Sequence, residues 1–371
     1  MAVQWKANTA ELASRGGFDS DGDAAPAGIV LAQASRGDGE SLPWLVADGR
    51  ALPLREWADK WPLGRVGSLT ELLECWPDHE SDLRDLTTLT ETRELVLARG
   101  DDIGSLLVQA PIQPRQTFCT IGNYVRQVVE AATYADDGAD GPRAPARRAS
   151  ALEALHRRRR TGEPYVCLTS SERVGSPIGN LSIAPGVETL DWEVEIAVVF
   201  GAPARRISPG NAASVIAGYC VANDLTVRSL VVREDLPALG SDWIQSKGMP
   251  GSLPLGPWFV PAWQVPDTAQ LRLRLSVNGI VMQDDTAEDM LFDIEHQIAY
   301  LSQHTGLRPG NVLCTGSPAG FGVHHGRFVR VGDVVSAQVS GLGEQRLLCV
   351  EEELPQARVT PQQATEKVHM R

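Results

Sequence analysis

The clearest chemical signal in the sequence is a pair of acidic residues at the head of an apolar segment, residues 190–200 (LDWEVEIAVVF). Alternate side chains of a β-strand share one face, so Glu193 and Glu195 should point the same way and Val194 the opposite way. Two adjacent carboxylates repel each other unless a cation neutralises them. The pattern therefore indicates a candidate site for a hard metal ion, although exposed strand edges also carry Glu-x-Glu.

A third acid follows the next apolar segment. Residues 215–222 run directly into Asn223-Asp224, so a strand end could present Asp224 as another oxygen ligand, with Arg228 close behind. Carboxylates without His or Cys companions favour Mg²⁺ or Mn²⁺ over zinc. Lys247 precedes a Pro- and Gly-rich stretch. A loop lysine is usually solvated, and only its neighbours can give it a role.

These residues must be positioned by a β-rich body. Short β-branched runs between Gly and Pro predict strands at residues 193–200, 215–221, 271–277, 310–313 and 331–339. Residues 289–303 carry apolar side chains at helical spacing, namely Met290, Ile294, Ile298 and Leu301. We interpret them as the buried face of one core helix.

The N-terminal part predicts a small structural module over residues 27–105. Residues 43–54 are typical of a hairpin around Asp48-Gly49, and Ser68 with Glu71 forms a capping-box pattern that predicts a helix. This module contains no cluster of catalytic residue types. Residues 1–26 and the tail 355–371 lack periodicity, and we expect both to be flexible or disordered.

A polar insertion, residues 134–162, changes from acidic to strongly basic and has a helical pattern near residues 151–160. We interpret it as a lid or an exposed loop. Its run Arg157–Arg160 suits a solvated helix end or a gate for an anionic substrate. No aromatic residues interleave with the arginines, which disfavours a nucleic-acid platform.

Composition narrows the function classes. The 371 residues are 43% hydrophobic and carry 34 Lys and Arg against 47 Asp and Glu, a net charge of −13. This is typical of a globular protein and argues against nucleic acid or an anionic membrane as the main partner. No apolar run of about eighteen residues is present to span a bilayer, and no signal peptide is evident, so we expect a cytoplasmic protein. Six scattered cysteines without a CxxC pair suit buried thiols better than disulfides or zinc.

Several short motifs in fixed order carry a family resemblance. They are Ile121-Gly122-Asn123-Tyr124, Asp191–Glu195, Ala217–Tyr219 with Asn223-Asp224 and Arg228, Lys247 with Pro254–Trp258, Val277–Gly279 with Gln283, Thr315–Gly322 and Val331–Asp333. Over roughly residues 110–350 the chain resembles the fumarylacetoacetate hydrolase superfamily. The resemblance implies a mostly β (α+β) fold, with a mixed β-sandwich roll at residues 106–354 and a small N-terminal β domain. It also implies a homodimer and a divalent metal at the open end of the roll.

The resemblance also assigns roles. It implies Glu193, Glu195 and Asp224 as metal ligands, with Mg²⁺ as the ion and Mn²⁺ or Ca²⁺ as alternatives. It makes Lys247 and Glu130 catalytic, and places Tyr124, Gln127, Arg228 and Ser317 at the substrate. Arg228 could equally form a structural ion pair. Ser317 stands where the family usually has Thr, which preserves the hydroxyl.

One position differs from the family pattern and weakens the transfer of the hydrolytic roles to this chain. Gln127 stands where many hydrolytic members have a histidine, three residues before Glu130, and glutamine cannot act as a base at pH 7. Glu130 would then activate water alone. Otherwise another base would replace the histidine, for example His156, His324 or His325, or Arg126 would be brought inward by a local shift.

The resulting expectation is a metal-dependent hydrolase that cleaves a C–C bond of a small anionic dicarbonyl, of acylpyruvate or β-diketo acid type. Decarboxylation, tautomerisation or hydration of a 2-oxo acid such as oxaloacetate is the alternative, because enolate stabilisation needs no attacking water. A non-catalytic binding protein on the same fold is a further alternative. It would predict eroded metal ligands, whereas all three acids are present.

Overall fold

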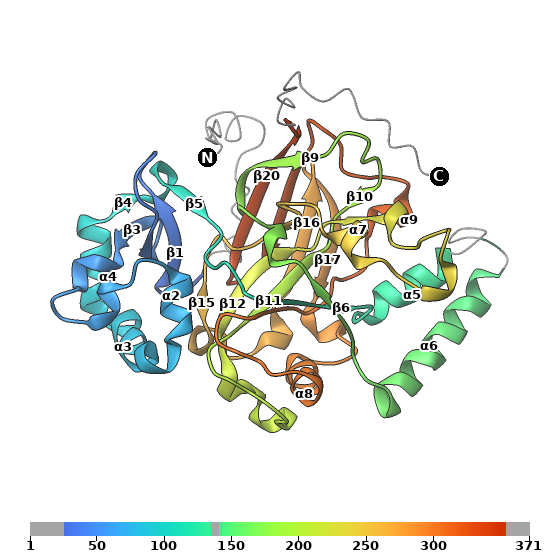
Figure 1. Ribbon diagram of the computed structural model, residues 1–371, viewed down its shortest axis with the longest axis horizontal. Helices are drawn as coiled ribbons and strands as arrows, with labels where there is room; N and C mark the ends of the chain where they lie inside the picture. Colours follow the sequence, from blue (N-terminus) through green and yellow to red (C-terminus); the bar gives the residue numbers. More distant parts are fainter. Residues whose placement is uncertain (1–25, 135–140, 142, 354–371) are drawn as a thin grey trace, which may run out of the picture.

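The computed structural model describes residues 26–134, 141 and 143–353 (Figure 1). The expected flexible segments, residues 1–26 and 355–371, lie outside the described residues apart from Pro26, and so do residues 135–140 and 142 near the start of the insertion. The fold is strand-rich and mixed α+β, which confirms the predicted class. Within the described part of the chain, no helix is both long and apolar enough to cross a membrane.

The N-terminal module combines a five-stranded sheet, in the order β4-β3-β2-β1-β5, with three helices. Asp48 and Gly49 have φ values of 46° and 76°, the positive values expected of the predicted hairpin turn. The Ser68 hydroxyl accepts from the Glu71 backbone N–H at 3.1 Å, as the capping pattern predicts. Two further helices in this module were not predicted. The elements are β1 (Val30–Ser35), β2 (Leu42–Ala47), β3 (Arg50–Pro53), β4 (Asp101–Asp102), β5 (Leu107–Gln109), α2 (Leu69–Glu74), α3 (Trp76–Thr88) and α4 (Thr90–Arg99).

Two larger sheets form the body. The six-stranded sheet has the order β15-β12-β11-β18-β6-β7, and the five-stranded sheet has the order β17-β16-β19-β20-β9. The first comprises β6 (Thr117–Ile121), β7 (Tyr165–Thr169), β11 (Val194–Phe200), β12 (Ile216–Asn223), β15 (Val260–Pro261) and β18 (Val312–Cys314). The second comprises β9 (Ile178–Ile183), β16 (Arg272–Val277), β17 (Ile280–Thr286), β19 (Val334–Val339) and β20 (Gly343–Glu351).

Strand β11 is buried on both faces. Its even-numbered residues from Val194 to Phe200 join a core with β16 and β19 of the opposite sheet. Ala197 and Val199 face a second core, on the outer side of the six-stranded sheet. Two short strand pairs complete the body, β10 (Leu190–Asp191) with β13 (Thr226–Val227) and β8 (Val174–Gly175) with β14 (Leu253–Pro254). The alternation predicted from the sequence thus places Glu195 and Ala197 on one side and Val194 on the other.

The second core joins the N-terminal module to the body. Leu31 of β1 exchanges both backbone hydrogen bonds with Phe259, at 3.1 and 2.8 Å. Trp76, the first residue of α3, meets Phe259 edge to face at 5.5 Å and stacks on Trp263 at 5.9 Å, measured between ring centroids. The module is therefore packed onto the outer face of the sheet that carries β11.

Helices flank the body. The elements are α5 (Val125–Tyr134), α6 (Ala144–Thr161), α7 (Trp243–Lys247), α8 (Ile294–His304) and α9 (Gly322–His325). The predicted core helix is α8. Its predicted apolar residues are buried, but it begins at Ile294 because the Asp293 carboxylate caps the His296 N–H at 2.8 Å.

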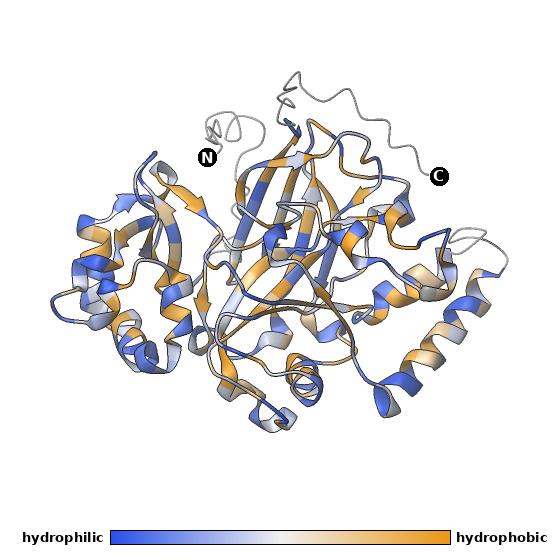
Figure 2. Cartoon of the chain, viewed as in Figure 1, coloured by the Kyte–Doolittle hydropathy of each residue, from blue (hydrophilic) through white to orange (hydrophobic). Residues whose placement is uncertain are grey.

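The insertion is more tightly held than the sequence suggested. Hydrophilic residues cover most of α6 (Figure 2), yet two arginines of its basic run contact backbone carbonyls rather than solvent alone. Arg158 donates to Gly122 O at 3.1 Å, and Arg159 donates to Met290 O at 2.9 Å. The run is largely exposed, as expected of a solvated helix end, and Arg158 and Arg159 in addition anchor α6 to the body.

Four cysteines lie across the six-stranded sheet at one level. Cys119 pairs with Cys167 on one side and with Cys314 on the other, and Ala197 pairs with both Cys314 and Cys220. Directly paired residues share a face, so these side chains form one buried row, which we call the thiol row. All six cysteines of the chain are free.

We expect Trp76→Ala to destabilise the whole protein. The substitution removes a buried indole that fills the space between the module and the sheet, at a cost of about 3–5 kcal/mol. Urea unfolding followed by intrinsic fluorescence and circular dichroism should show one transition at a lower midpoint. Leu97→Ala, at an exposed position of the same module, is the matched control and should change stability by about 0.5 kcal/mol or less. Two separate transitions in the wild type would contradict a shared core.

Candidate active site

Three buried carboxylates meet at one end of the β11–β12 pair. Glu193 immediately precedes β11, Glu195 is its second residue, and Asp224 immediately follows β12. The pairing of Val194 with Asn223 sets this arrangement, and the Asp224 N–H donates to Glu193 O at 2.8 Å. One oxygen from each acid lies within 4.8 Å of the others. The register of one antiparallel pair thus assembles the cluster.

Three cations surround these carboxylates. Lys247 Nζ lies 2.7 Å from Asp224 Oδ2 and 3.3 Å from Glu193 Oε2. Arg173 Nη1 lies 2.6 Å from Asp224 Oδ1, and Arg228 Nη2 lies 2.7 Å from Glu193 Oε1. Lys247 ends α7 and only 1% of its side chain is exposed, so it is not the solvated loop lysine that its type suggests.

The ion pairs govern the charge states of the partners. Burial alone would raise the pKa of Asp224, but Arg173 and Lys247 hold it at about 2. Burial alone would lower the pKa of Lys247, but Asp224 and Glu193 raise it above its usual value. Both groups are therefore charged at neutral pH.

Glu195 differs from the other two acids because it has no cationic partner of its own. Its Oε2 accepts the Gly316 N–H at 2.8 Å, while its buried Oε1 has no hydrogen-bond partner among the described residues. Burial, reinforced by Asp224 and Glu193, raises the pKa of Glu195 well above its usual range. An orphaned carboxylate oxygen close to two other acids is a group that a bound cation would satisfy.

The donor set fits a divalent hard metal. Glu193, Glu195 and Asp224 offer oxygen atoms only, the ligands that Mg²⁺, Mn²⁺ and Ca²⁺ prefer. Counting Asp191 beside them, four carboxylates face three cationic side chains. A divalent ion would make the summed charge of these groups positive, which suits an anionic ligand.

The Tyr124 hydroxyl is a second orphan. It is buried, and no described residue forms a hydrogen bond with it. Burial raises the pKa of Tyr124 well above its usual value, and Glu195 adds to the shift, so the phenol stays protonated and can donate. Its free donor and the free oxygen of Glu195 are the polar groups that a ligand would satisfy.

Asp191 ties Arg228 and α9 to the cluster. It accepts from Arg228 Nε at 2.8 Å and from the backbone N–H groups of Gly322 and Val323 at 2.7 and 3.1 Å. A Cβ on Gly322 would lie 2.8 Å from Asp191 Oδ1, so this close approach requires glycine. Arg228 bridges Asp191 and Glu193 and therefore forms the structural ion pair that the sequence left open.

Ser317 lies in the loop after β18. Its Oγ accepts from Gln283 Nε2 at 2.9 Å, and the side-chain oxygen of Gln283, Oε1, accepts the Val194 N–H at 3.0 Å. Gln283 thus fixes the loop to β11. The Ser317 hydroxyl hydrogen remains available to a ligand.

Glu130 and Gln127 face the same loop from α5. Glu130 Oε2 accepts the Gly320 N–H at 2.8 Å, and Gln127 is buried one helical turn earlier. Arg126 does not turn inward. Its side chain is mostly exposed and pairs with Asp285 at 2.9 Å. His325 approaches Glu130, with Nε2 3.8 Å from Oε1.

Sequence reasoning missed Arg173 and Thr226. Arg173 is fully buried and also donates to the carbonyls of Leu225 and Ser252. The Thr226 hydroxyl donates to Glu193 Oε1 at 3.1 Å and accepts from Lys247 at 2.7 Å. Thr226 could have been suspected from its place two residues after Asp224. Arg173 lies 51 positions before Asp224, and no local pattern marks it.

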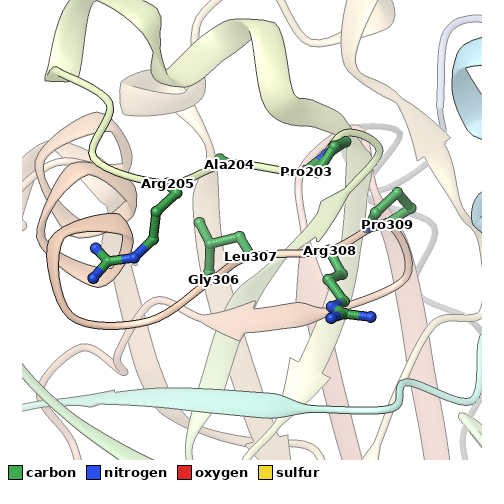
Figure 3. Close-up of a pocket in the computed structure, with 7 residues that line it drawn as sticks. All are labelled: Pro203, Ala204, Arg205, Gly306, Leu307, Arg308 and Pro309. Atoms are coloured by element: carbon green, nitrogen blue, oxygen red, sulfur yellow. The ribbon is translucent and has the colours of Figure 1, made fainter.

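A surface hollow elsewhere is unrelated to this cluster. It lies between the segments 203–205 and 306–309, with Arg205 and Arg308 at its rim (Figure 3). These segments follow the C-terminal end of β11 and precede β18, whereas the carboxylates occupy the other end of β11.

The family assignment follows from comparison with known proteins. The family model described as fumarylacetoacetate (FAA) hydrolase C-terminal matches residues 116–348, so the chain belongs to this family. The match contains the carboxylates, Lys247, Glu130 and the Ser317 loop. The N-terminal module lies before it.

The chain is also similar to individual relatives and solved structures. A protein of Burkholderia multivorans, named provisionally as a hydrolase, is 36% identical over 186 residues, 49% of this chain and 64% of that protein. Maleylpyruvate hydrolase from Sphingobium sp. SYK-6, solved with manganese(II) and pyruvate, aligns with TM-score 0.62 and 19% identity over 87% of this chain and 100% of its own. The 2-hydroxyhepta-2,4-diene-1,7-dioate isomerase of Mycobacterium marinum gives 0.58 and 21%, over 87% and 99%. At these identities the structural likeness shows the fold alone.

We expect Glu195→Gln to abolish binding of a divalent cation. The amide keeps the shape of the side chain but replaces the anionic ligand with a neutral one. Calorimetric titration of Mg²⁺ or Mn²⁺ into chelator-treated protein should show binding in the wild type and none in the variant.

Asp284→Asn serves as the matched control, because this exposed carboxylate pairs with Arg272 on β16, away from the cluster. It should bind the ion as the wild type does. Undiminished binding in Glu195→Gln would remove the metal site from the carboxylate cluster.

Proposed function

We propose that the chain is a Mg²⁺-dependent hydrolase that cleaves a C–C bond of an acylpyruvate or a related β-diketo acid, with Mn²⁺ or Ca²⁺ as alternative ions. The observation that carries the proposal is the orphaned Glu195 Oε1 among three buried carboxylates. The family assignment supports hydrolytic chemistry. The manganese(II) and pyruvate in the maleylpyruvate hydrolase structure support a divalent ion and a 2-oxo acid.

The residues around the cluster suit an anionic dicarbonyl. A divalent ion held by Glu193, Glu195 and Asp224 would supply Lewis-acid stabilisation of an enolate. Lys247 adds a fixed positive charge beside the same carboxylates, where negative charge grows in the transition state. The Tyr124 and Ser317 hydroxyls can donate to substrate oxygens and orient them.

Glu130 supplies a carboxylate for proton transfer. The Gly320 N–H fixes one of its oxygens, which leaves the other free to act. Cleavage requires water to lose a proton as it attacks the distal carbonyl carbon, and a positioned base contributes about 10²–10⁴-fold.

A second reaction deserves a separate test. Gln127 is buried one helical turn before Glu130, and it cannot accept a proton at neutral pH. This observation favours decarboxylation or tautomerisation of a 2-oxo acid such as oxaloacetate, which needs the enolate but no attacking water.

A substrate panel distinguishes the two reactions. Acylpyruvates, fumarylpyruvate and oxaloacetate are incubated with Mg²⁺ or Mn²⁺, with loss of enol absorbance followed and products identified by chromatography. We expect an acylpyruvate to yield pyruvate and a carboxylic acid.

Glu195→Gln is the control for contaminating activity and should give no turnover. Release of CO₂ and pyruvate from oxaloacetate, without cleavage of any acylpyruvate, would replace the hydrolase with the decarboxylase.

A homodimer forms part of the proposal. Strand β7 is an edge of the six-stranded sheet, and Leu168 on it is 60% exposed. Ile244 on the neighbouring α7 is 68% exposed, and the Tyr165 ring lies 6.5 Å from Trp243. An unpaired edge strand with exposed apolar side chains suits a second copy of the chain. Since α7 ends at Lys247, the interface would adjoin the site.

We expect Leu168→Glu with Ile244→Glu to convert a wild-type dimer into a monomer, because a charge buried in an interface is costly. Size-exclusion chromatography with light scattering measures the mass. Ile280→Glu changes an equally exposed isoleucine on β17 and should leave the dimer intact. A monomeric wild type would contradict the proposal.

A cytoplasmic location is proposed with this function. The six free thiols support it, since an oxidising compartment favours disulfides.

A further inference from the structure

An imidazole from a distant part of the chain meets Glu130. His325, the last residue of α9, places Nε2 3.8 Å from Glu130 Oε1. The other oxygen of Glu130 is held by the Gly320 N–H, so the carboxylate cannot swing away without losing that bond. The Tyr134 ring lies beside both histidines of α9: its centroid is 5.1 Å from that of the preceding residue, His324, in a tilted arrangement, and 6.2 Å from that of His325, edge to face.

The position of this pair relative to the carboxylate cluster is fixed. Asp191 accepts the first two N–H groups of α9 and also pairs with Arg228, which in turn pairs with Glu193. Side-chain exposure rises from 1% at Lys247 and 8% at Glu193 to 18% at Arg228 and Glu130, and to 41% at His325. Glu130 and His325 are therefore more accessible to solvent than Lys247 and Glu193 are.

We propose that His325, oriented by Glu130, is the catalytic base that takes the proton from the attacking water. The proposal rests on the hydrolase function proposed above. It assigns Glu130 a positioning role, in which the carboxylate orients the imidazole and stabilises its protonated form.

The proton and electron pairs balance without another reactant. His325 accepts a proton as the water oxygen bonds to the distal carbonyl carbon of the acylpyruvate. The C–C bond then breaks, its electron pair stays on the pyruvate fragment as an enolate, and the protonated imidazole returns the proton to that carbon. The other fragment leaves as a carboxylic acid, which loses its proton to solvent. The imidazole ends in its starting state.

The contact is long for a direct hydrogen bond, and one water or a small side-chain rotation bridges such a distance. Contacts of this kind shorten when substrate binds. Gln127 lies on the same face of α5 as Glu130 and offers no titratable group. His325 of α9 is thus an imidazole that approaches Glu130 from outside α5.

Other groups near the pair must be separated from it. His324, Tyr134, Arg228 and Asp191 all face the same region. Burial lowers the pKa of His324, and Arg228 acts in the same direction while Glu130 opposes them. His324 is therefore neutral at pH 7 and serves as a control for the effect of losing a ring.

The test compares steady-state hydrolysis of an acylpyruvate by the Mg²⁺-loaded wild type, His325→Gln, His324→Gln and the double variant His325→Gln/Gln127→His. We expect His325→Gln to lower kcat about 100-fold with little change in KM, and His324→Gln to behave as the wild type. The double variant should regain at least about tenfold, because Gln127→His gives Glu130 an imidazole from its own helix.

The pH profile is the second readout. A base that is already protonated cannot take a proton from water, so wild-type kcat/KM should fall as the pH is lowered. In His325→Gln that acid limb should disappear, whereas a merely structural residue would leave it in place. Circular dichroism and the thermal midpoint should be unchanged, since His325 is exposed.

The outcomes are separable. A wild type that cleaves the substrate, with His325→Gln equally active or with its acid limb retained, would overturn this assignment and leave the hydrolase proposal standing. A wild type that cleaves no acylpyruvate would overturn both.

Discussion

The burial of carboxylates at one end of the β11–β12 pair is the constraint on which the site depends. Removing an isolated charge from water costs several kcal/mol even after relaxation, so each of these acids needs a partner at close range. Arg173 and Lys247 provide it for Asp224, and Arg228 provides it for Asp191 and Glu193. Glu195 has a single backbone donor, and its second oxygen is left over. Cationic side chains thus neutralise the other acids of the cluster, and one carboxylate oxygen, Oε1 of Glu195, is left without a partner among the described residues.

The sheet and the loop after β18 hold Glu195 in place. Strand β11 lies inside a sheet and between two cores, so it cannot move without disturbing both. The loop after β18 reaches the same point because Gly316 binds Glu195 and Gln283 connects Ser317 to β11. The groups that approach from outside, Glu130 and His325, are borne by short helices near the surface. The carboxylate cluster is thus held rigidly by the sheet, while Glu130 and His325 lie on more accessible elements, an arrangement that suits entry of a substrate.

The sequence predicted the carboxylate cluster better than the groups that approach it from other parts of the chain. The two-residue period of a strand is local information, so the shared side of Glu193 and Glu195 and the acid after the next strand followed directly from spacing. The hairpin at Asp48-Gly49 and the core face of α8 followed for the same reason. The partnership of Arg173 with Asp224 and of His325 with Glu130 joins positions far apart in the chain, and no periodicity encodes them. The anchoring of α6 was not predicted for the same reason, because the carbonyl partners of its arginines, at Gly122 and Met290, lie far from the basic run in the sequence.

The thiol row has a consequence for watching the protein move. Ala197, which lies in the row between Cys314 and Cys220, is two residues from Glu195 on the same side of β11, and Cys314 lies two residues before Gly316. Burial raises the pKa of the Cys220 thiol, so it is both shielded and slow to form a thiolate. An alkylating reagent can therefore label the row only while the sheet is locally open, and Cys75, exposed on the N-terminal module, labels without such an event. The ratio of the two labelling rates gives the free energy of opening directly beneath Glu195. The cysteines of the chain thus allow the local stability of the strands beside the carboxylate cluster to be measured without an added label.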